Sequence, residues 1–189
     1  MIQTQIMKLL VLNHKFHYEM EKLVRIFMPD EKIEVIYDQA IDDFNLLTAV
    51  EDEITVTVNF DGFFKTLIAP LCDDNEMQMG RMVYALLSEY TGFSPKWGVL
   101  TGVRPSKLLI NTEKLMGREK TEEYFKTDLL VTQEKFSLAR SVADQEERII
   151  ATSKPESFSL YISIPFCPSR CSYCSFVSHS ISNANAKRL

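Results

Sequence analysis

The chain has 189 residues, of which 46% are hydrophobic and 25% are charged, and its formal net charge is −5. This composition is typical of a globular protein long enough for one well-packed domain and part of another, and it excludes the disordered and fibrous classes. The acidic balance argues against a general nucleic-acid surface, and the lack of a long apolar run or a leader predicts a cytoplasmic protein without a membrane span.

The chain begins with a predicted strand, helix and strand. Apolar runs indicate strands over Gln5–Leu12 and Lys32–Tyr37. His14 and His17 lie near the start of the helix, and without a nearby cysteine or carboxylate pair we interpret them as surface residues rather than metal ligands. The helix is predicted by apolar residues at helical spacing, ended by a proline: Met20, Leu23, Val24, Phe27, Met28 and Pro29.

A pair of antiparallel strands is predicted between Asn45 and Ala69, because apolar and polar residues alternate there between turn-forming residues. Cys72 stands alone and is interpreted as a partly buried apolar residue. A covering helix with a stop at Gly92 is then indicated by Met79, Met82, Val83, Leu86, Leu87 and Tyr90. Residues 1–92 are thus expected to form a small α+β domain with a few antiparallel strands.

Residues 93–157 are predicted to form a helical section and a linker. Pro105 suits the first turn of a helix that runs to Gly117, and Arg104 and Lys107 make its N-terminus a potential anion site as well as a plain cap with surface charges. Thr132 can cap a further helix that ends before the linker Ser153–Pro155. Alternation over Phe158–Ile164 then predicts a strand that leads into a cysteine-rich loop.

Three of the four cysteines, Cys167, Cys171 and Cys174, follow one another with the spacing Cys-x-x-x-Cys-x-x-Cys. A structural zinc ion usually takes four donors in two separated pairs, whereas three thiolates on one loop can hold three corners of an iron–sulfur cubane. The fourth iron would keep an open position, which S-adenosylmethionine can chelate through its amino and carboxylate groups. The spacing therefore suggests radical chemistry.

These residues resemble a known signature. The stretch from Leu160 to Cys174 is similar to the radical S-adenosylmethionine signature of oxygen-independent coproporphyrinogen III oxidases, and Trp97–Lys107 resembles the HemZ-type coproporphyrinogen dehydrogenase branch. The resemblance implies that Cys167, Cys171 and Cys174 hold a [4Fe-4S] cluster. It also implies that Tyr161 and Tyr173 contact S-adenosylmethionine.

The activity implied by the resemblance is a radical oxidative decarboxylation in haem biosynthesis. A 5′-deoxyadenosyl radical abstracts hydrogen from two propionates of coproporphyrinogen III, which become the vinyl groups of protoporphyrinogen IX. The implied partners are the porphyrinogen substrate and an electron donor such as flavodoxin or ferredoxin. No residue of this chain is assigned to the catalytic step itself.

Two differences between this chain and the family that it resembles leave other hypotheses open. Ser163 and Phe176 replace a histidine and a cysteine of the best-studied branch, and haem chaperones of the same superfamily share the Tyr-Cys-x-Phe ending. A TIM barrel takes about 200 residues or more, so residues 158–189 are expected to be only the start of an incomplete radical S-adenosylmethionine barrel. The alternatives are a haem-binding chaperone, or a truncated chain in which the cysteines bind a structural zinc or nothing.

Overall fold

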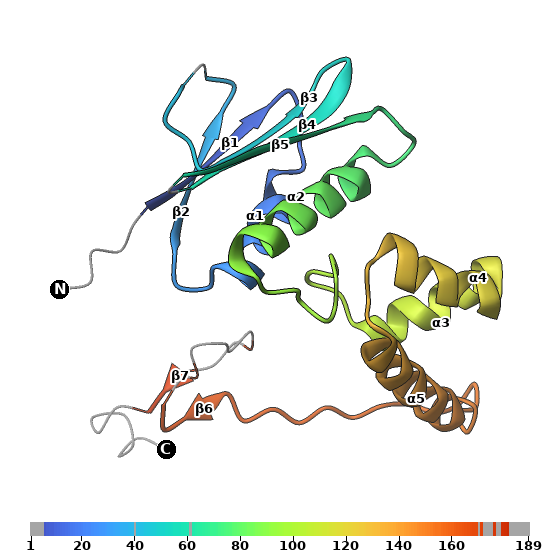
Figure 1. Cartoon of the computed structure of the whole chain (residues 1–189). Coiled ribbons are helices and arrows are strands. Elements are labelled where there is room, and N and C mark those ends of the chain that lie inside the picture. Colours follow the sequence, from blue (N-terminus) through green and yellow to red (C-terminus); the bar gives the residue numbers. More distant parts are fainter. Residues whose placement is uncertain are drawn as a thin grey trace. The chain divides into compact units, whose positions relative to one another are not determined.

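The computed structural model describes residues 6–39, 41–60, 62–169, 171, 176 and 179–181. The chain divides into two compact units, Met1–Ile150 and Ala151–Leu189. Figure 1 traces the elements of both units along the chain. We describe each unit by itself.

The first unit is built on a five-stranded sheet with the order β2-β1-β3-β4-β5. β1 is parallel to both of its neighbours, and β3, β4 and β5 form an antiparallel meander. The predicted antiparallel pair between residues 45 and 69 was wrong in number, because both turns around residues 51 and 62 are used and three strands result. The sheet is mixed rather than antiparallel, and its strands are β1 Ile6–Leu12, β2 Lys32–Tyr37, β3 Leu46–Val50, β4 Glu53–Phe60 and β5 Phe63–Pro70.

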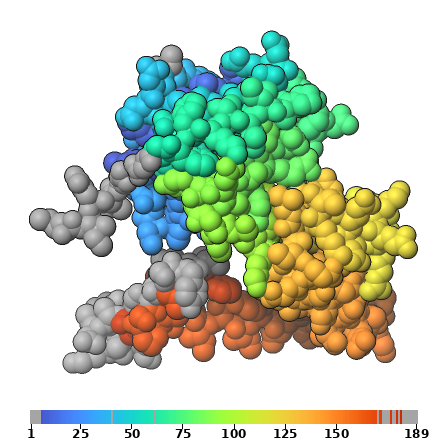
Figure 2. All heavy atoms as spheres, viewed as in Figure 1, coloured from blue at the N-terminus to red at the C-terminus, as the bar shows by residue number. Residues whose placement is uncertain are grey.

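Two helices, α1 (His17–Phe27) and α2 (Asn75–Thr91), cover one face of this sheet (Figure 1). Asp74 caps α2 by accepting from the Met77 amide, and Gly92 ends it in the left-handed conformation that glycine adopts without strain. The atoms of α2 and of the strands pack closely (Figure 2). The core between them consists mainly of Met7, Leu9, Val11, Met20, Leu23, Val24, Leu46, Ile54, Val56, Val58, Met79, Val83, Leu86 and Leu87. The predicted α+β class is confirmed for this part of the chain.

A helical section completes the first unit. The predicted helices are present as α3 (Pro105–Met116) and α5 (Gln133–Ile150), and Thr132 Oγ1 accepts from the Lys135 amide at the start of α5. Between them lie α4 (Arg118–Glu123) and a π-helical turn, η1 (Tyr124–Asp128), which the sequence patterns did not predict. These elements enclose a second core of Leu109, Phe125, Leu129, Val131, Phe136, Ala139 and Ala143.

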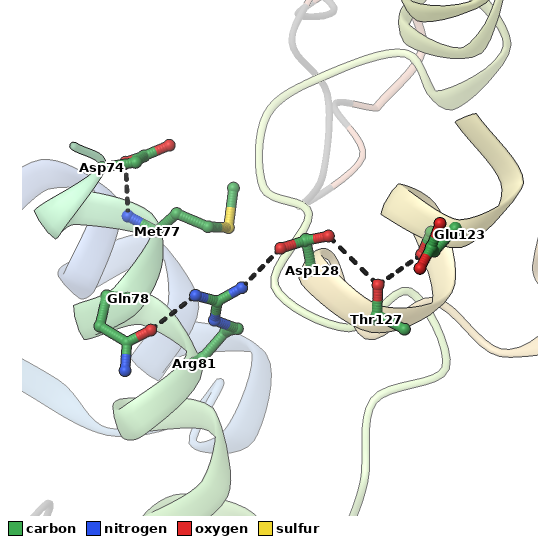
Figure 3. Close-up of polar contacts among 7 residues, drawn as sticks. All are labelled: Asp74, Met77, Gln78, Arg81, Glu123, Thr127 and Asp128. Atoms are coloured by element: carbon green, nitrogen blue, oxygen red, sulfur yellow. Dashed lines mark hydrogen bonds and ion pairs between the residues drawn. The ribbon is translucent and has the colours of Figure 1, made fainter. Parts of the chain in front are cut away.

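Arg81 connects α2 to the helical section. Its guanidinium donates to Asp128 Oδ1 at 2.9 Å and to Gln78 Oε1 at 2.6 Å, and Asp128 Oδ2 accepts from the Thr127 hydroxyl at 3.2 Å (Figure 3). The sheet layer and the helical section therefore share polar contacts within the first unit. The domain boundary at residue 92 stays a prediction.

Two side chains lie differently from their predicted environments. His14 is half-buried, and its Nε2 lies 3.2 Å from the Thr48 carbonyl oxygen while its Nδ1 accepts from the Phe16 amide at 3.1 Å. It is therefore a hydrogen-bonded residue between β1 and β3 rather than a surface residue at the helix entry. Cys72 is exposed rather than partly buried, because it lies in the polar turn before α2.

The second unit contains, among its described residues, two short strands, β6 (Phe166–Cys167) and β7 (His179–Ser180). Residues 158–165 belong to no strand. The described residues of this unit form no barrel. Within the part of the chain that the structure describes, no helix has the length and apolarity needed to cross a membrane.

Candidate metal centre

The cysteine loop is closed at its base by the parallel pair β6 and β7. The His179 amide donates to the Pro165 carbonyl, and the Ile181 amide donates to the Cys167 carbonyl, both at 2.8 Å. Phe166 lies opposite His179 in this pair, and their ring centroids are 6.1 Å apart. The backbone thus holds residues 165–167 and 179–181, which flank the cysteine-rich segment, side by side.

Two of the three predicted cluster ligands lie among the described residues. Cys167 is half-buried and Cys171 is exposed, and both are free thiols. Free thiols on one loop are the donors that an iron–sulfur cluster requires. Cys174 and Tyr173 lie outside the described residues. The described residues alone contain no group of three or more histidine, cysteine or carboxylate side chains able to hold a metal ion.

Tyr161, the other predicted cofactor contact, lies in a stretch without strand partners. Its side chain is 78% exposed, and the alternating apolar residues around it are exposed as well. The strand predicted over Phe158–Ile164 is therefore wrong for this chain as it stands. A strand needs a neighbour for its backbone hydrogen bonds, and the structure provides none for these residues.

The Trp97–Lys107 segment is held against the end of η1. The Val99 amide donates to the Leu129 carbonyl at 3.0 Å, and the Thr132 amide donates to the Lys96 carbonyl at 3.0 Å. Gly98 has φ +59°, and a Cβ there would lie 1.9 Å from the Leu129 carbonyl oxygen. This glycine is required by close backbone approach, a role that the sequence patterns did not predict.

Arg104 and Lys107 lie at the start of α3, as predicted. Arg104 occupies the N-cap position without a side-chain cap, and Pro105 is the first helical residue. The Arg104 side chain is 65% exposed, and its Nη2 lies 3.8 Å from Glu146 Oε2 on α5. A long ion pair of this kind fits a structural role and still leaves the guanidinium accessible to an anion.

An apolar groove of about 510 Å³ lies beside this helix start. Trp97, Leu100, Val103 and Pro105 contribute to its wall, so much of the motif segment faces it. The groove and the exposed guanidinium of Arg104 are thus the two features of the Trp97–Lys107 segment that could contact a ligand.

The comparisons agree with the resemblance seen in the sequence. The chain is 37% identical over 99 residues to the oxygen-independent coproporphyrinogen-III oxidase-like protein HemZ of Bacillus subtilis. The matched residues are 51% of this chain and 20% of that protein, so the chain spans about a fifth of the length of the relative it matches. No family model matches the chain. No solved structure matches it. The predicted resemblance is confirmed: this chain is a distant, partial homologue of an oxygen-independent coproporphyrinogen III oxidase-like protein.

Proposed function

We propose that the chain carries the cluster-binding loop of an oxygen-independent coproporphyrinogen III oxidase-like radical S-adenosylmethionine protein of haem biosynthesis. The observation that carries this proposal is the Cys-x-x-x-Cys-x-x-Cys loop in a chain that is 37% identical to HemZ over 99 residues. Cys167, Cys171 and Cys174 would hold a [4Fe-4S] cluster as thiolates. When bound, that cluster supplies the electron that cleaves S-adenosylmethionine.

The residues of the chain have positioning roles in this proposal. The β6–β7 pairing holds the base of the loop, so that the thiol of Cys167 starts from a fixed backbone position. Tyr161 and Tyr173 would contact S-adenosylmethionine. The substrate would be coproporphyrinogen III, whose propionates lose carbon dioxide as they become vinyl groups, and a flavodoxin or ferredoxin would deliver electrons.

Cluster assembly tests the ligand set directly. Each loop cysteine is changed to alanine in turn, and iron and acid-labile sulfide are counted after anaerobic reconstitution. We expect each of Cys167→Ala, Cys171→Ala and Cys174→Ala to lose most of the iron. Cys72→Ala is the matched control, because this exposed thiol lies in the other unit. Full iron retention in a loop variant, or iron loss in the control, would refute the ligand set.

A haem-binding chaperone is the alternative, and it is supported by Phe176 at the second position after Cys174. The two functions differ in a measurable product. With a reductant and S-adenosylmethionine, a full-length homologue that is an oxidase is expected to release 5′-deoxyadenosine in a coproporphyrinogen-dependent manner. Stoichiometric haem binding without that product would favour the chaperone.

We expect the 189-residue chain by itself not to convert coproporphyrinogen III. Tyr161 lies in an exposed stretch without strand neighbours, so the cofactor contact it would make is not held in place. The chain could then be non-catalytic even with its cluster loaded. Formation of protoporphyrinogen IX by the purified chain, measured anaerobically by chromatography, would contradict this expectation.

Arg104 and Lys107 are proposed to hold a substrate propionate at the start of α3. Support comes from the uncapped helix start, the accessible guanidinium and the apolar groove beside it. Arg104→Leu should weaken anaerobic binding of coproporphyrinogen III, whereas Lys114→Leu at the other end of the same helix should not. Equal affinities would leave Arg104 only its structural ion pair with Glu146.

A further inference from the structure

The amino ends of the parallel strands surround a pocket of about 440 Å³ in the first unit. The start of β1, the end of β4 and the carboxyl end of α2 contribute to its wall, together with the residues that follow α1 and those that precede β3. We call it the strand-start pocket. Its volume lies within the range of about 300–1,000 Å³ that small-molecule sites occupy. Neither the cysteine loop nor the Trp97 segment contributes to it.

The charges around the strand-start pocket favour a cation. Among the described residues that line it are two carboxylates, Glu31 and Asp43, and one ammonium, Lys8, which together carry net negative charge. Lys8 is already occupied, because its Nζ forms an ion pair with Asp43. Since Lys8 and Asp43 neutralise each other, Glu31 is the carboxylate that can pair with a cationic ligand.

Glu31 has an unmet hydrogen-bonding requirement. Its Oε2 is buried from solvent and has no hydrogen-bond partner among the described residues. A buried carboxylate oxygen without a partner is costly, and a charged donor is the partner that stabilises it most. The Glu31 carboxylate also lines the pocket, so its negative charge would attract an ammonium group there.

The carboxyl ends of two helices add to the negative electrostatic potential in the pocket. Met28, the C-cap of α1, and Thr91, the last residue of α2, both line the pocket. The carboxyl end of a helix carries partial negative charge and favours cations. In α1 the basic residue of the last turn, Arg25, is paired with Glu21, and α2 has no basic residue in its last turn. The negative ends of both helices are thus left for another cation.

The remaining wall is aromatic. Phe60 and Tyr90 line the pocket and stack on one another, with ring centroids 4.7 Å apart and an interplanar angle of 13°. Because the rings cover one face of each other, they offer the pocket apolar surface for the body of an organic ligand. A divalent metal ion needs several oxygen ligands, which two aromatic rings do not provide. Among the described residues no group of three or more metal-binding side chains exists.

We propose that the strand-start pocket binds a small organic cation that carries an ammonium group and an apolar or aromatic body. The ammonium group pairs with the Glu31 carboxylate, and the apolar body lies against the Phe60–Tyr90 wall. Asn45 shapes the floor, because its side chain accepts from the Lys8 amide at 2.9 Å and donates to the Asn59 carbonyl at 3.4 Å. This fixes β1, β3 and β4 around the pocket before any ligand arrives.

Calorimetric titration of the full chain with 2-phenylethylammonium tests the proposal. We expect saturable binding of this cation and no detectable binding of 3-phenylpropionate, an anion of similar size. Glu31→Gln, which keeps the shape and removes the charge, should weaken binding about tenfold. Glu53→Gln on the exposed start of β4 is the matched control and should bind as the parent chain does. Equal binding of the anion, or unchanged binding by Glu31→Gln, would overturn the proposal.

A second variant should change the affinity for 2-phenylethylammonium in the opposite direction. Lys8→Met removes the only ammonium that the described residues place in the pocket and frees Asp43, so it should tighten 2-phenylethylammonium binding. A purely structural disturbance would weaken binding in both variants. Chemical-shift changes confined to the side chains of Asn45 and Tyr90 would place the cation in this pocket, whereas changes elsewhere, or competition by magnesium at equal concentration, would refute the assignment.

Discussion

The strands of the first unit and the stretch 158–164 of the second unit have the same kind of sequence and opposite environments. In β4, Ile54, Val56 and Val58 alternate with polar residues and are all fully buried. In the second unit, Leu160, Ile162 and Ile164 alternate in the same way and are 77–81% exposed. The difference is that β4 has strand neighbours on both sides and a helix layer over its apolar face. Alternation therefore encodes the capacity to be a strand, and neighbours decide whether the strand forms.

Limited proteolysis should show the largest difference between the two regions. Cleavage within the buried core of the first unit requires that core to unfold, whereas residues 151–169 are exposed throughout most of their length. Cleavage in that segment should be about a thousandfold faster or more. Mass spectrometry of the early fragments checks this. Early cuts within β4 or α2 would show that the core is not the protected part.

Gly98→Ala should destabilise the first unit by about 4 kcal/mol or more, because the new Cβ would collide with the backbone of Leu129. Gly102→Ala is the matched control. Gly102 also has positive φ, at +65°, but no atom lies within 4 Å of the place that a Cβ would take, so only the backbone cost of about 1–2 kcal/mol is expected. Urea denaturation measures both values. Similar losses would mean that the backbone angle, and not the close approach, matters at position 98.

Leu23→Ala should cost about 2–5 kcal/mol, because this side chain is 2% exposed in the core between α1 and the sheet. Ile162→Ala removes similar apolar surface from a residue that is 78% exposed, and its effect should lie within about 0.5 kcal/mol. Thermal or urea denaturation of both variants checks the contrast. A large cost at Ile162 would reveal a partner for the second unit.

Substitution of His14 should change the free energy of unfolding least, and the change should depend on pH. Burial lowers the pKa of His14, and the Phe16 amide that donates to Nδ1 leaves no room for a second proton on the ring. The neutral ring is thus the folded form. Its contribution is present above the ordinary histidine pKa of about 6.5 and is lost as the pH falls through the lowered pKa of the folded state.

The loss at low pH should stay below about 1 kcal/mol, because the ring is only partly shielded from solvent. Urea midpoints of the parent chain and of His14→Gln, measured at pH 7.5 and pH 5, provide the test. The parent should lose more stability than the variant on acidification. Equal losses would show that other groups carry the pH dependence.

The sequence predicted those parts of the fold whose signals are local. Pro105, Thr132 and Gly92 indicated helix ends correctly, since caps and prolines act within one turn. The apolar residues Val142 and Ile149 of α5 are exposed, because helical spacing in the sequence does not say which turns of a helix meet a neighbour. The parallel pairing of β1 on both sides was not foreseen, since it joins residues far apart in the chain.

The features of the candidate site also divide into those with a local sequence pattern, which were predicted, and those without one, which were not. The cysteine spacing is a local pattern and could be recognised at once, whereas Gly98 serves a contact with Leu129 that no local pattern contains. The strand-start pocket was missed altogether. Its lining comes from five separate segments of the chain, and Glu31 carries no motif that distinguishes it from the other carboxylates of an acidic chain.

The place of β1 within the sheet sets an order of folding. β3, β4 and β5 are joined by short turns and can pair soon after they are made, whereas β1 must pair with β3 across the intervening α1 and β2, as in the contact between Leu9 and Leu46. On the ribosome β1 is made before β3, so it is held with one side unpaired until Val50 has left the exit tunnel. A nascent chain arrested before that point exposes a strand edge, and arrested chains of increasing length should become resistant to protease only once the β3–β5 meander is complete.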